Sequence, residues 1–292
     1  MSRARRLGRT AVLGVPFVWL LVFFLLPFAV VLKVSLSEPD IAQPPYQPLF
    51  GENWEYLGSF ANYVFLTEDT LYTTAYLNSI WMAAVATLLC LLIAYPMAYL
   101  IARSRPATRL TLLMMVVLPF WTSSLLRIYA LIGLLNTTGF INTVLLWLGV
   151  ISEPIQMMQT DFAVYAGIVM TYLPLMILPL YATLEKLDET LLEASADLGA
   201  GGIGTFWQIT LPISLPGILA GCLLVFIPAV GEFVIPQLMG GPDQLMIGKV
   251  LWTEYFNNRD WPVASAIAIA MLAFLVIPFM ILRNAPAMRG EV

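Results

Sequence analysis

The sequence predicts an all-α fold that crosses a membrane several times, and three observations lead to that class. Hydrophobic residues make up 60% of the 292 residues and charged residues only 11%, whereas soluble domains carry about 25% charged residues. The apolar residues gather into runs long enough, as helices, to cross the ~30 Å hydrocarbon core of a bilayer. Basic residues concentrate in the connections on one side of these runs. We expect one polytopic domain, residues 1–292, with six transmembrane helices at about residues 11–32, 72–102, 110–126, 162–184, 213–239 and 261–282.

The first two spans are the clearest in the sequence. The run at 11–32 follows four arginines but lacks the small-residue cleavage site of a signal peptide, so we expect it to be retained and to span. The polar segment 33–71, which contains several prolines, should form an exposed loop. The run at 72–102 contains no charge and exceeds what a bilayer requires, which predicts a tilted helix or one that extends past the bilayer.

The run at 128–150 is ambiguous because it is also uncharged and could form a seventh span. However, polar and glycine residues interrupt it at 136–139. The apolar side chains of its second half fall on one helical face, and they are Phe140, Ile141, Val144, Leu145 and Leu148. This pattern favours a short helix that lies in the membrane interface. A seventh span would also place the N-terminal arginines and the segment 185–212 on opposite sides of the membrane.

The distribution of positive charge predicts the orientation. With six spans, ten of the 14 Lys and Arg residues fall on one side, and they are Arg3, Arg5, Arg6, Arg9, Arg103, Arg105, Arg109, Lys186, Arg283 and Arg289. The other four are Lys33, Arg127, Lys249 and Arg259. Both termini and residues 185–212 are therefore expected in the cytoplasm. The outer loops carry eleven acidic residues against these four basic ones, an excess that would attract cations.

The segment 185–212, called the knob below, connects the fourth and fifth spans. Asp188 can cap a helix whose apolar residues recur at helical spacing, and Gly199 can end that helix. After a bend rich in glycine, Thr205 is expected to begin a second short helix, which Pro212 and a further proline end. The sequence thus predicts a helix–bend–helix that stands on the membrane domain.

A motif within the knob carries a family resemblance. Six residues stand at the spacing E-A-x4-G-x9-I-x-L-P, and they are Glu193, Ala194, Gly199, Ile209, Leu211 and Pro212. This spacing resembles the EAA signature of the permease subunits of bacterial ABC importers, with Ser195 in place of the second alanine. The resemblance implies a type I ABC importer permease fold in which the knob is a cytoplasmic coupling loop that docks into a cleft on an ATPase.

One carboxylate, Glu232, falls well inside an apolar span. A carboxylate at that depth costs several kcal/mol unless it faces water or a partner. It could form a buried pair with Arg127, or it could contact substrate on a translocation path, and the sequence leaves both open. Trp121, Tyr172 and Phe233 are candidate walls of that path because aromatic faces attract cations. Aromatic residues at such positions also serve as interfacial anchors or core packing.

The sequence offers no catalytic constellation. It contains no histidine, which removes the most common general base and metal ligand, and no G-x4-G-K-S/T phosphate loop. Cys90 and Cys222 both fall in apolar runs and are expected to be buried, without a disulfide. We therefore expect a transport subunit without enzymatic activity, cofactor or metal, whose energy comes from another chain or an ion gradient.

Two further stretches resemble one branch of these permeases. Residues 118–135 and the stretch from Phe226 to Pro262 are similar to the corresponding segments of polyamine importer permeases, the putrescine branch in particular. The resemblance implies a bacterial inner membrane location, a second related permease, two copies of a cytoplasmic ABC ATPase and a periplasmic polyamine-binding protein. Alternatives are a permease of this kind for spermidine or another solute, and a gradient-driven carrier. Such a carrier would show paired broken helices in an internal repeat, and none is evident.

Overall fold

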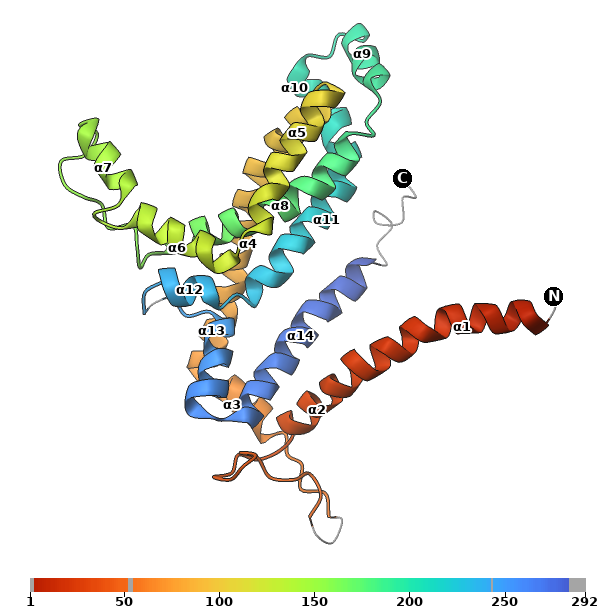
Figure 1. The fold of residues 1–292 in the computed structure, drawn as a ribbon, viewed down its shortest axis with the longest axis vertical. Helices are drawn as coiled ribbons and strands as arrows, with labels where there is room; N and C mark the ends of the chain where they lie inside the picture. The colour runs from red at the N-terminus through yellow and green to blue at the C-terminus, as the bar shows by residue number, and fades with distance from the viewer. Residues whose placement is uncertain (1–2, 52–54, 243, 284–292) are drawn as a thin grey trace. The chain divides into compact units, whose positions relative to one another are not determined.

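The computed structural model describes residues 3–51, 55–242 and 244–283, and across these ranges the chain forms helices and no β-strand (Figure 1). The predicted all-α polytopic class is thereby confirmed. Three residues that contribute to the predicted charge of the two sides lie outside the described residues, and they are Glu52, Asp243 and Arg289.

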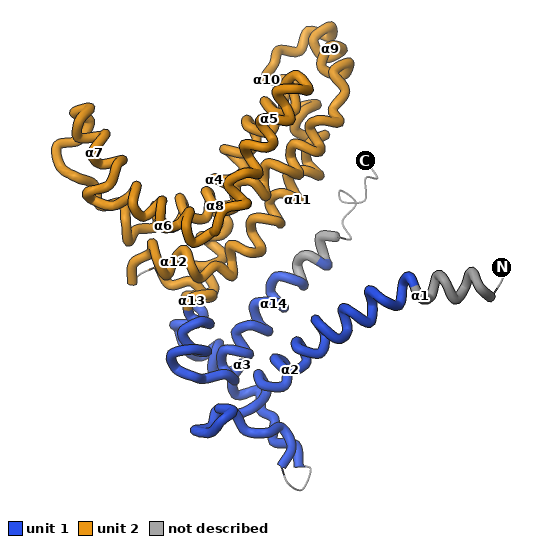
Figure 2. The backbone as a smooth tube through the Cα atoms, in the orientation of Figure 1, with its two compact units in different colours: residues 1–73, 250–284 blue, residues 74–249, 285–292 orange. Residues whose placement is uncertain are grey.

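The chain divides by its internal contacts into two compact units (Figure 2), and the single domain expected from the sequence stays a prediction. The first comprises residues 1–73 and 250–284, and the second comprises residues 74–249 and 285–292.

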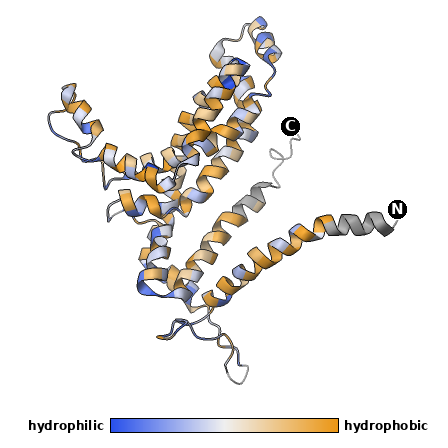
Figure 3. Ribbon diagram, in the orientation of Figure 1, coloured by the Kyte–Doolittle hydropathy of each residue, from blue (hydrophilic) through white to orange (hydrophobic). Residues whose placement is uncertain are grey.

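The first unit holds the N-terminal helix and the last helix. Its elements are α1 (Arg3–Leu20), the π-helix η1 (Leu21–Leu25), α2 (Leu26–Ser35), α3 (Ala61–Glu68), the start of α4 (Thr70–Arg103), the end of α13 (Ile247–Trp252), the π-helix η4 (Thr253–Asn258) and α14 (Trp261–Arg283). α14 packs against α2 and α3. The most apolar window of residues 12–35 contains no buried residue, so this helix presents apolar side chains outward (Figure 3). A bilayer is the environment in which such a helix is stable.

The second unit contains the knob and every residue of the expected substrate path. Its elements are the rest of α4, α5 (Pro106–Val117), the 3-10 helix η2 (Leu118–Trp121), α6 (Ser124–Leu135), α7 (Phe140–Trp147), α8 (Asp161–Leu184), α9 (Glu189–Asp197), α10 (Gly202–Thr205), the π-helix η3 (Phe206–Thr210), α11 (Leu211–Val230), α12 (Val234–Met239) and the start of α13.

The helices α8 and α11 form the closest pair in this unit. Gly217 and Gly221 lie four residues apart on α11 and face α8. A Cβ atom at Gly217 would lie 2.5 Å from Oγ1 of Thr183 and 2.8 Å from the carbonyl oxygen of Pro179. A Cβ atom at Gly221 would lie 2.6 Å from Sδ of Met176. The two backbones can approach because these positions lack side chains, as is typical of Gly-x3-Gly pairs in membrane helices.

A stripe of small residues on α4 joins α8 and α11 in one apolar core. Cys90, Ala94, Ala98 and Ala102 recur every fourth residue, are buried, and belong to one apolar core with α8 side chains such as Met176. Cys90 is buried as expected, whereas Cys222 on α11 is only partly buried. The four-residue spacing places the whole stripe on one helix face.

The helix lengths match the expected spans unevenly. Among the described residues, five helical stretches are long and apolar enough to cross a membrane, and they are Val12–Ser35, Thr70–Arg103, Ser124–Trp147 (α6 and α7 together), Asp161–Leu184 and Gly202–Val230. The expected third span corresponds to a shorter apolar helix, Pro106–Trp121, and the expected sixth span corresponds to α14. The third ends early because Pro119 leads into the 3-10 turn η2 and extended backbone at Thr122.

The ambiguous run is interrupted at residues 136–139, as the sequence predicts. The interruption separates α6, with 12 residues, from α7, with 8 residues. At ~1.5 Å per residue, either helix is shorter than the ~30 Å core of a bilayer. The side chain of Asn142 donates to the carbonyl oxygens of Asn136 and Ile155, at 3.1 and 2.9 Å. These bonds tie α7 to the turn that precedes it and to the segment that follows it. The six-span topology with an interfacial α7 stays a prediction.

Candidate functional site

A break between α11 and α12 forms the centre of the candidate substrate site. α11 ends at Val230, Gly231 follows as its C-cap, and α12 begins at Val234. The start of α13 lies directly on this break. A Cβ atom at Gly248 would lie 2.4 Å from the carbonyl oxygen of Gly231 and 2.7 Å from that of Glu232. The break is therefore a packed feature that holds Glu232 in a defined place.

The carboxylate of Glu232 caps the N-terminus of α12. Its Oε1 accepts the backbone N–H groups of Phe233, Val234 and Ile235, at 3.2, 3.0 and 3.4 Å. These are donors that a helix N-terminus leaves unsatisfied, and the positive end of a helix favours a carboxylate. The cap stabilises a carboxylate inside an apolar span without a cationic partner.

Tyr172 of α8 donates its hydroxyl hydrogen to Oε2 of Glu232. The close packing of α8 on α12 brings the two together, since a Cβ atom at Gly167 would lie 2.6 Å from Ile235 Cγ2. Glu232 and Tyr172 line a cavity of about 430 Å³. The other lining residues are Phe120, Thr122, Ser124, Arg127, Ile128, Thr171, Val234 and Ile235. The structure thus brings together three of the five residues expected on the path, Glu232, Tyr172 and Arg127, in one cavity.

The alternative of a buried pair between Glu232 and Arg127 is not what the structure shows. Ion pairs among the described residues involve Arg103 and Arg109, and none joins Arg127 to Glu232. The guanidinium of Arg127 lies over the ring of Phe120, with Cζ 5.6 Å from the ring centroid. Its Nε and Nη1 atoms are buried and have no hydrogen-bond partner in the described part of the chain. The carboxylate has backbone donors instead, so it needs no cation.

The expected aromatic walls are only partly present. Trp121 is 83% exposed and does not line the cavity, where its neighbour Phe120 lies instead. Phe233 contributes its backbone N–H to Glu232. A continuous helix through 110–126 would have directed Trp121 differently, and the change of register begins at Pro119 in η2. That proline is the sequence signal that could have identified Phe120.

The chemistry available here is recognition of a hydrogen-bond donor. Three backbone donors share Oε1 of Glu232, whereas Oε2 accepts only the Tyr172 hydroxyl among the described residues, so Oε2 retains capacity for an ammonium group. Among the described residues, no three Cys, Asp or Glu side chains converge as a metal ion would need. The site therefore suits binding and passage of a cation.

The knob is the second candidate site, and it lies at the end of the bundle of α4, α5, α8 and α11 (Figure 1). Asp188 caps α9 as predicted, since its Oδ1 accepts the N–H of Thr190 at 3.0 Å. Hydrogen bonds from Thr190 lower the pKa of the Asp188 carboxyl below its ordinary value. The cap fixes where the chain leaves α8 and enters the knob.

Gly199 ends α9 in the left-handed conformation, with φ of 85°. Its N–H bonds the carbonyl oxygen of Ala196 at 2.9 Å, and the N–H of Ala200 bonds that of Ser195 at 3.0 Å. This is the Schellman arrangement, which favours glycine at the left-handed position. Apart from its chain neighbours, no atom of the described residues lies within 4 Å of a Cβ atom built at Gly199. Backbone conformation, and not close approach within the chain, therefore explains the glycine.

The second half of the knob differs from the expected short helix. α10 begins at Gly202 and continues through η3 into α11, so one helix extends from Gly202 to Val230. Pro212 does not end it, because the π-turn of η3 directly before the proline accommodates the missing N–H. Ser195 and Thr205 join α9 to α10 through their hydroxyl groups, 2.9 Å apart.

The motif residues fall on two surfaces of the knob. Glu193, Ala194 and Pro212 are exposed, whereas Ile209 and Leu211 are partly buried. Three apolar side chains outside the motif are strongly exposed nearby: Leu198 at 89%, Ile203 at 80% and Trp207 at 63%. Leu198 belongs to the apolar residues that recur at helical spacing in the sequence of this helix, whereas no sequence signal identified Ile203 or Trp207. Exposed apolar groups on a polar segment mark a surface for a partner.

Two ion pairs hold the knob to the turn between α4 and α5. Nη1 of Arg103 lies 3.0 Å from Oε1 of Glu189, and Nη1 of Arg109 lies 2.8 Å from Oε1 of Glu185. Arg109 also donates through Nη2 to the carbonyl oxygen of Ala102 at 2.9 Å. The basic turn that predicted the orientation therefore also fixes the base of the knob.

Known proteins are similar to this chain in sequence and in fold. The family model described as "Binding-protein-dependent transport system inner membrane component" matches residues 94–290. The spermidine/putrescine transport system permease protein PotB of Haemophilus influenzae is 41% identical over 261 residues, which cover 89% of this chain and 88% of that protein. PotB of Escherichia coli K12 is 42% identical over 259 residues, which cover 87% and 88%.

Solved structures extend the likeness to the fold. A bacterial ABC transporter that imports the acidic polysaccharide alginate contains a chain with a TM-score of 0.71 and 17% identity, covering 99% of this chain and 98% of that one. A second structure of the alginate transporter, in complex with a periplasmic protein bound to an alginate pentasaccharide, gives a TM-score of 0.73 at 15% identity, covering 97% and 95%. At these identities the likeness concerns the fold alone.

Proposed function

The chain belongs to the family of binding-protein-dependent transport system inner membrane components, and from that premise we propose that it is a permease subunit of an ATP-driven polyamine importer. In this role the chain binds and passes its substrate without reacting with it. ATP hydrolysis takes place on partner subunits. The observation that carries the substrate class is the carboxylate of Glu232, placed by a helix cap beside Tyr172 in a cavity of the helical bundle.

Polyamines suit this site because they carry ammonium groups separated by methylenes. Each ammonium needs an acceptor, for which Glu232 retains capacity, and the methylenes need apolar walls such as Ile128 and Ile235. The relatives with 41–42% identity are named as spermidine/putrescine permeases. We therefore propose both spermidine and putrescine as substrates, in place of putrescine alone.

The proposed partners follow from the family. We expect a second related permease, two copies of a cytoplasmic ABC ATPase and a periplasmic polyamine-binding protein. One solved relative was crystallised with its periplasmic protein. The knob is the proposed docking element for the ATPase, through the motif residues Glu193, Ala194, Gly199, Ile209, Leu211 and Pro212 together with the exposed Leu198, Ile203 and Trp207.

The proposed location is the bacterial inner membrane, with several spans and both termini in the cytoplasm. The support is the charge difference of ten basic residues against four. The ion pairs of Arg103 and Arg109 with the knob agree with this orientation, since they keep the knob on the side of the basic turn.

Glu232→Gln in the complete complex tests the substrate path. The glutamine oxygen can still cap α12, so the fold is retained while the charge is lost. A charge-assisted contact is worth about 1.5–3 kcal/mol, so uptake of labelled putrescine and spermidine per assembled complex should fall roughly ten- to a hundredfold.

Asp161→Asn is the matched control, because Asp161 also accepts a side-chain hydrogen bond, from Gln244 at 2.8 Å, but lies outside the cavity. Uptake should be unchanged in this variant. If Glu232 served only as a helix cap, Glu232→Gln would transport normally. That result would remove Glu232 from the path.

A further inference from the structure

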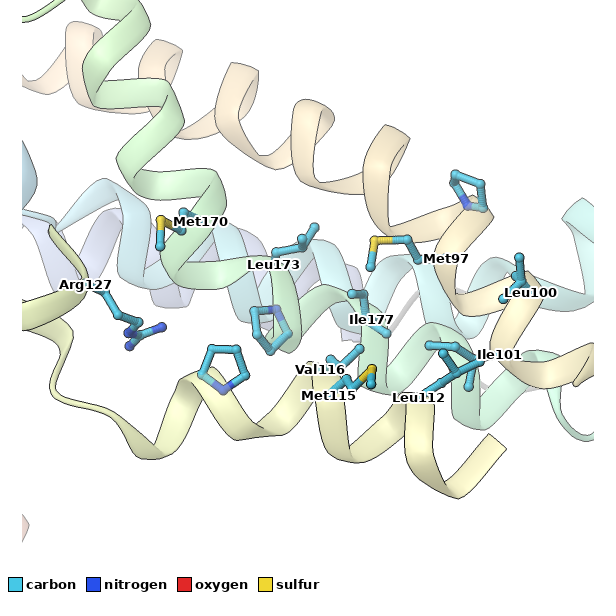
Figure 4. A pocket seen from close by; sticks show the side chains of 13 residues that line it. Met97, Leu100, Ile101, Leu112, Met115, Val116, Arg127, Met170, Leu173 and Ile177 are labelled. Carbon is cyan, nitrogen blue, oxygen red and sulfur yellow. The ribbon is translucent and has the colours of Figure 1, made fainter. Parts of the chain in front are cut away.

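A cavity of about 610 Å³ lies between α4, α5 and α8, separate from the one that contains Glu232 (Figure 4). Twelve of its 13 lining residues are apolar, among them Met97, Met115 and Met170 from the three helices. Its volume is within the range of ~300–1,000 Å³ typical of small-molecule sites. Methionine side chains adapt to flexible ligands. The cavity can therefore hold an apolar chain of variable shape.

Arg127 is the single charged residue of this cavity, and its guanidinium points toward it in Figure 4. Two of its N–H donors, Nε and Nη1, are buried without an acceptor in the described part of the chain. A buried N–H group without an acceptor is unfavourable. Since Glu232 does not pair with Arg127, a molecule outside this chain can supply the acceptor.

The shape and charge of the cavity together select the occupant. A polyamine does not fit, because its ammonium groups offer no acceptor and Arg127 would repel them. A phospholipid fits both parts, since its acyl chain fills apolar space and its phosphate accepts two hydrogen bonds from a guanidinium. The rim of the cavity is open, with Leu100 60% exposed and Met115 65% exposed. A lipid can therefore enter from the bilayer.

We propose that this cavity binds a phospholipid, with one acyl chain between α4, α5 and α8 and the phosphate on Arg127. The bound phosphate offsets the positive charge of Arg127, which also lines the cavity of Glu232. A cationic substrate then meets the carboxylate without an opposing charge beside it. The lipid phosphate would thus lie beside Arg127, the residue that lines both cavities.

Photo-crosslinking in the intact complex tests the occupant directly. Met115 is replaced by p-benzoylphenylalanine in the otherwise native chain, and the complex is reconstituted in vesicles of phosphatidylethanolamine and phosphatidylglycerol and irradiated. We expect mass spectrometry to find a phospholipid adduct on the α5 peptide. Crosslinking to the second permease, or no adduct, would overturn the proposal. The readout does not depend on uptake, so it stands apart from the proposed substrate.

The role of Arg127 is tested in the same assay. Arg127→Gln should lower the lipid adduct at least about tenfold, because a charge-assisted contact is lost. Arg127→Lys should retain part of it. Arg105→Gln, an exposed arginine outside the cavity, is the matched control and should crosslink normally. Equal adduct in Arg127→Gln would overturn the phosphate contact. If that variant fails to assemble, Met97→Trp, which fills the cavity, should abolish the adduct, and an unchanged adduct would refute the site.

Discussion

The knob and the α8–α11 pair share one continuous helix, Gly202 to Val230, yet different forces hold them. In the pair, Cβ atoms at Gly217 and Gly221 would lie 2.5 and 2.6 Å from the nearest atoms of α8, so no side chain larger than hydrogen fits without a shift. In the knob, glycines such as Gly199 and Gly201 have no atom within 4 Å of a built Cβ, and large apolar side chains are exposed. The pair is complete within this chain, whereas the knob presents a surface that a partner must cover.

The largest expected effect comes from a substitution that disrupts the packing of α8 on α11 and leaves the knob unchanged. Gly217→Leu would force a side chain against the carbonyl oxygen of Pro179 and against Thr183. Overpacking typically costs about 1–3 kcal/mol, and backbone atoms cannot move aside as side chains do, so we expect little assembled complex by size-exclusion chromatography. Gly201→Leu is the control, because Gly201 has open space and a φ of −73°. Equal loss in both variants would contradict the difference between the regions.

The next effect separates folding from coupling in the knob. Leu198→Asp combined with Ile203→Asp should leave the amount of complex unchanged, since both side chains are exposed. Docking to the ATPase should weaken, because burying one large apolar side chain contributes about 1.5–3 kcal/mol. Stimulation of ATP hydrolysis by loaded binding protein should fall at least about tenfold. Leu198→Met with Ile203→Met keeps the surface apolar and should retain stimulation. Full stimulation in the double aspartate variant would exclude this face as the docking surface.

A smaller effect is expected from the conformation of Gly199. An L-residue in the left-handed region costs about 1–2 kcal/mol, so Gly199→Leu should lower the thermal stability of the knob and reduce stimulated hydrolysis several-fold. Gly199→Asn should be milder, since asparagine tolerates this conformation better than leucine. Identical losses in both variants would instead indicate a steric block at a partner.

The smallest effect concerns the contact between α9 and α10. Ser195→Ala removes the hydroxyl that lies 2.9 Å from Oγ1 of Thr205, a bond worth about 0.5–1.5 kcal/mol. A cycle with Thr205→Ala should give a coupling energy near the low end of that range in thermal unfolding of the complex. Strict additivity of the two substitutions would mean that the hydroxyl pair does not stabilise the knob.

Local signals predicted the knob better than the contacts around Glu232. Asp188 as N-cap and Gly199 as C-cap depend only on neighbouring residues, and both are found where expected. The end at Pro212 was wrong, because a π-turn before a proline is a tertiary accommodation that no local pattern announces. The pairing of Tyr172 with Glu232 depends on the approach of α8 to α12 across 60 residues, and sequence alone suggested Arg127 as the partner.

Some missed features did have a signal in the sequence. The Gly217-x3-Gly221 pair and the four-residue stripe from Cys90 to Ala102 are visible as spacing, and they identify the faces that pack. Pro119 likewise indicated that the third apolar run would not stay helical to residue 126, which explains why Phe120 and not Trp121 lines the cavity.

Because the helix from Gly202 to Val230 is continuous, a movement at one end can be transmitted to the other end. Its 29 residues correspond to a rod of roughly 43 Å at ~1.5 Å per residue. The helix begins in the knob and ends at Val230, directly before the Gly231–Phe233 break that holds Glu232. Each degree of tilt about the knob would displace the far end by roughly 0.8 Å over this length. A tilt of a few degrees that α8 did not follow would therefore move the end of this helix by more than the tolerance of a hydrogen bond such as that between Tyr172 and Glu232.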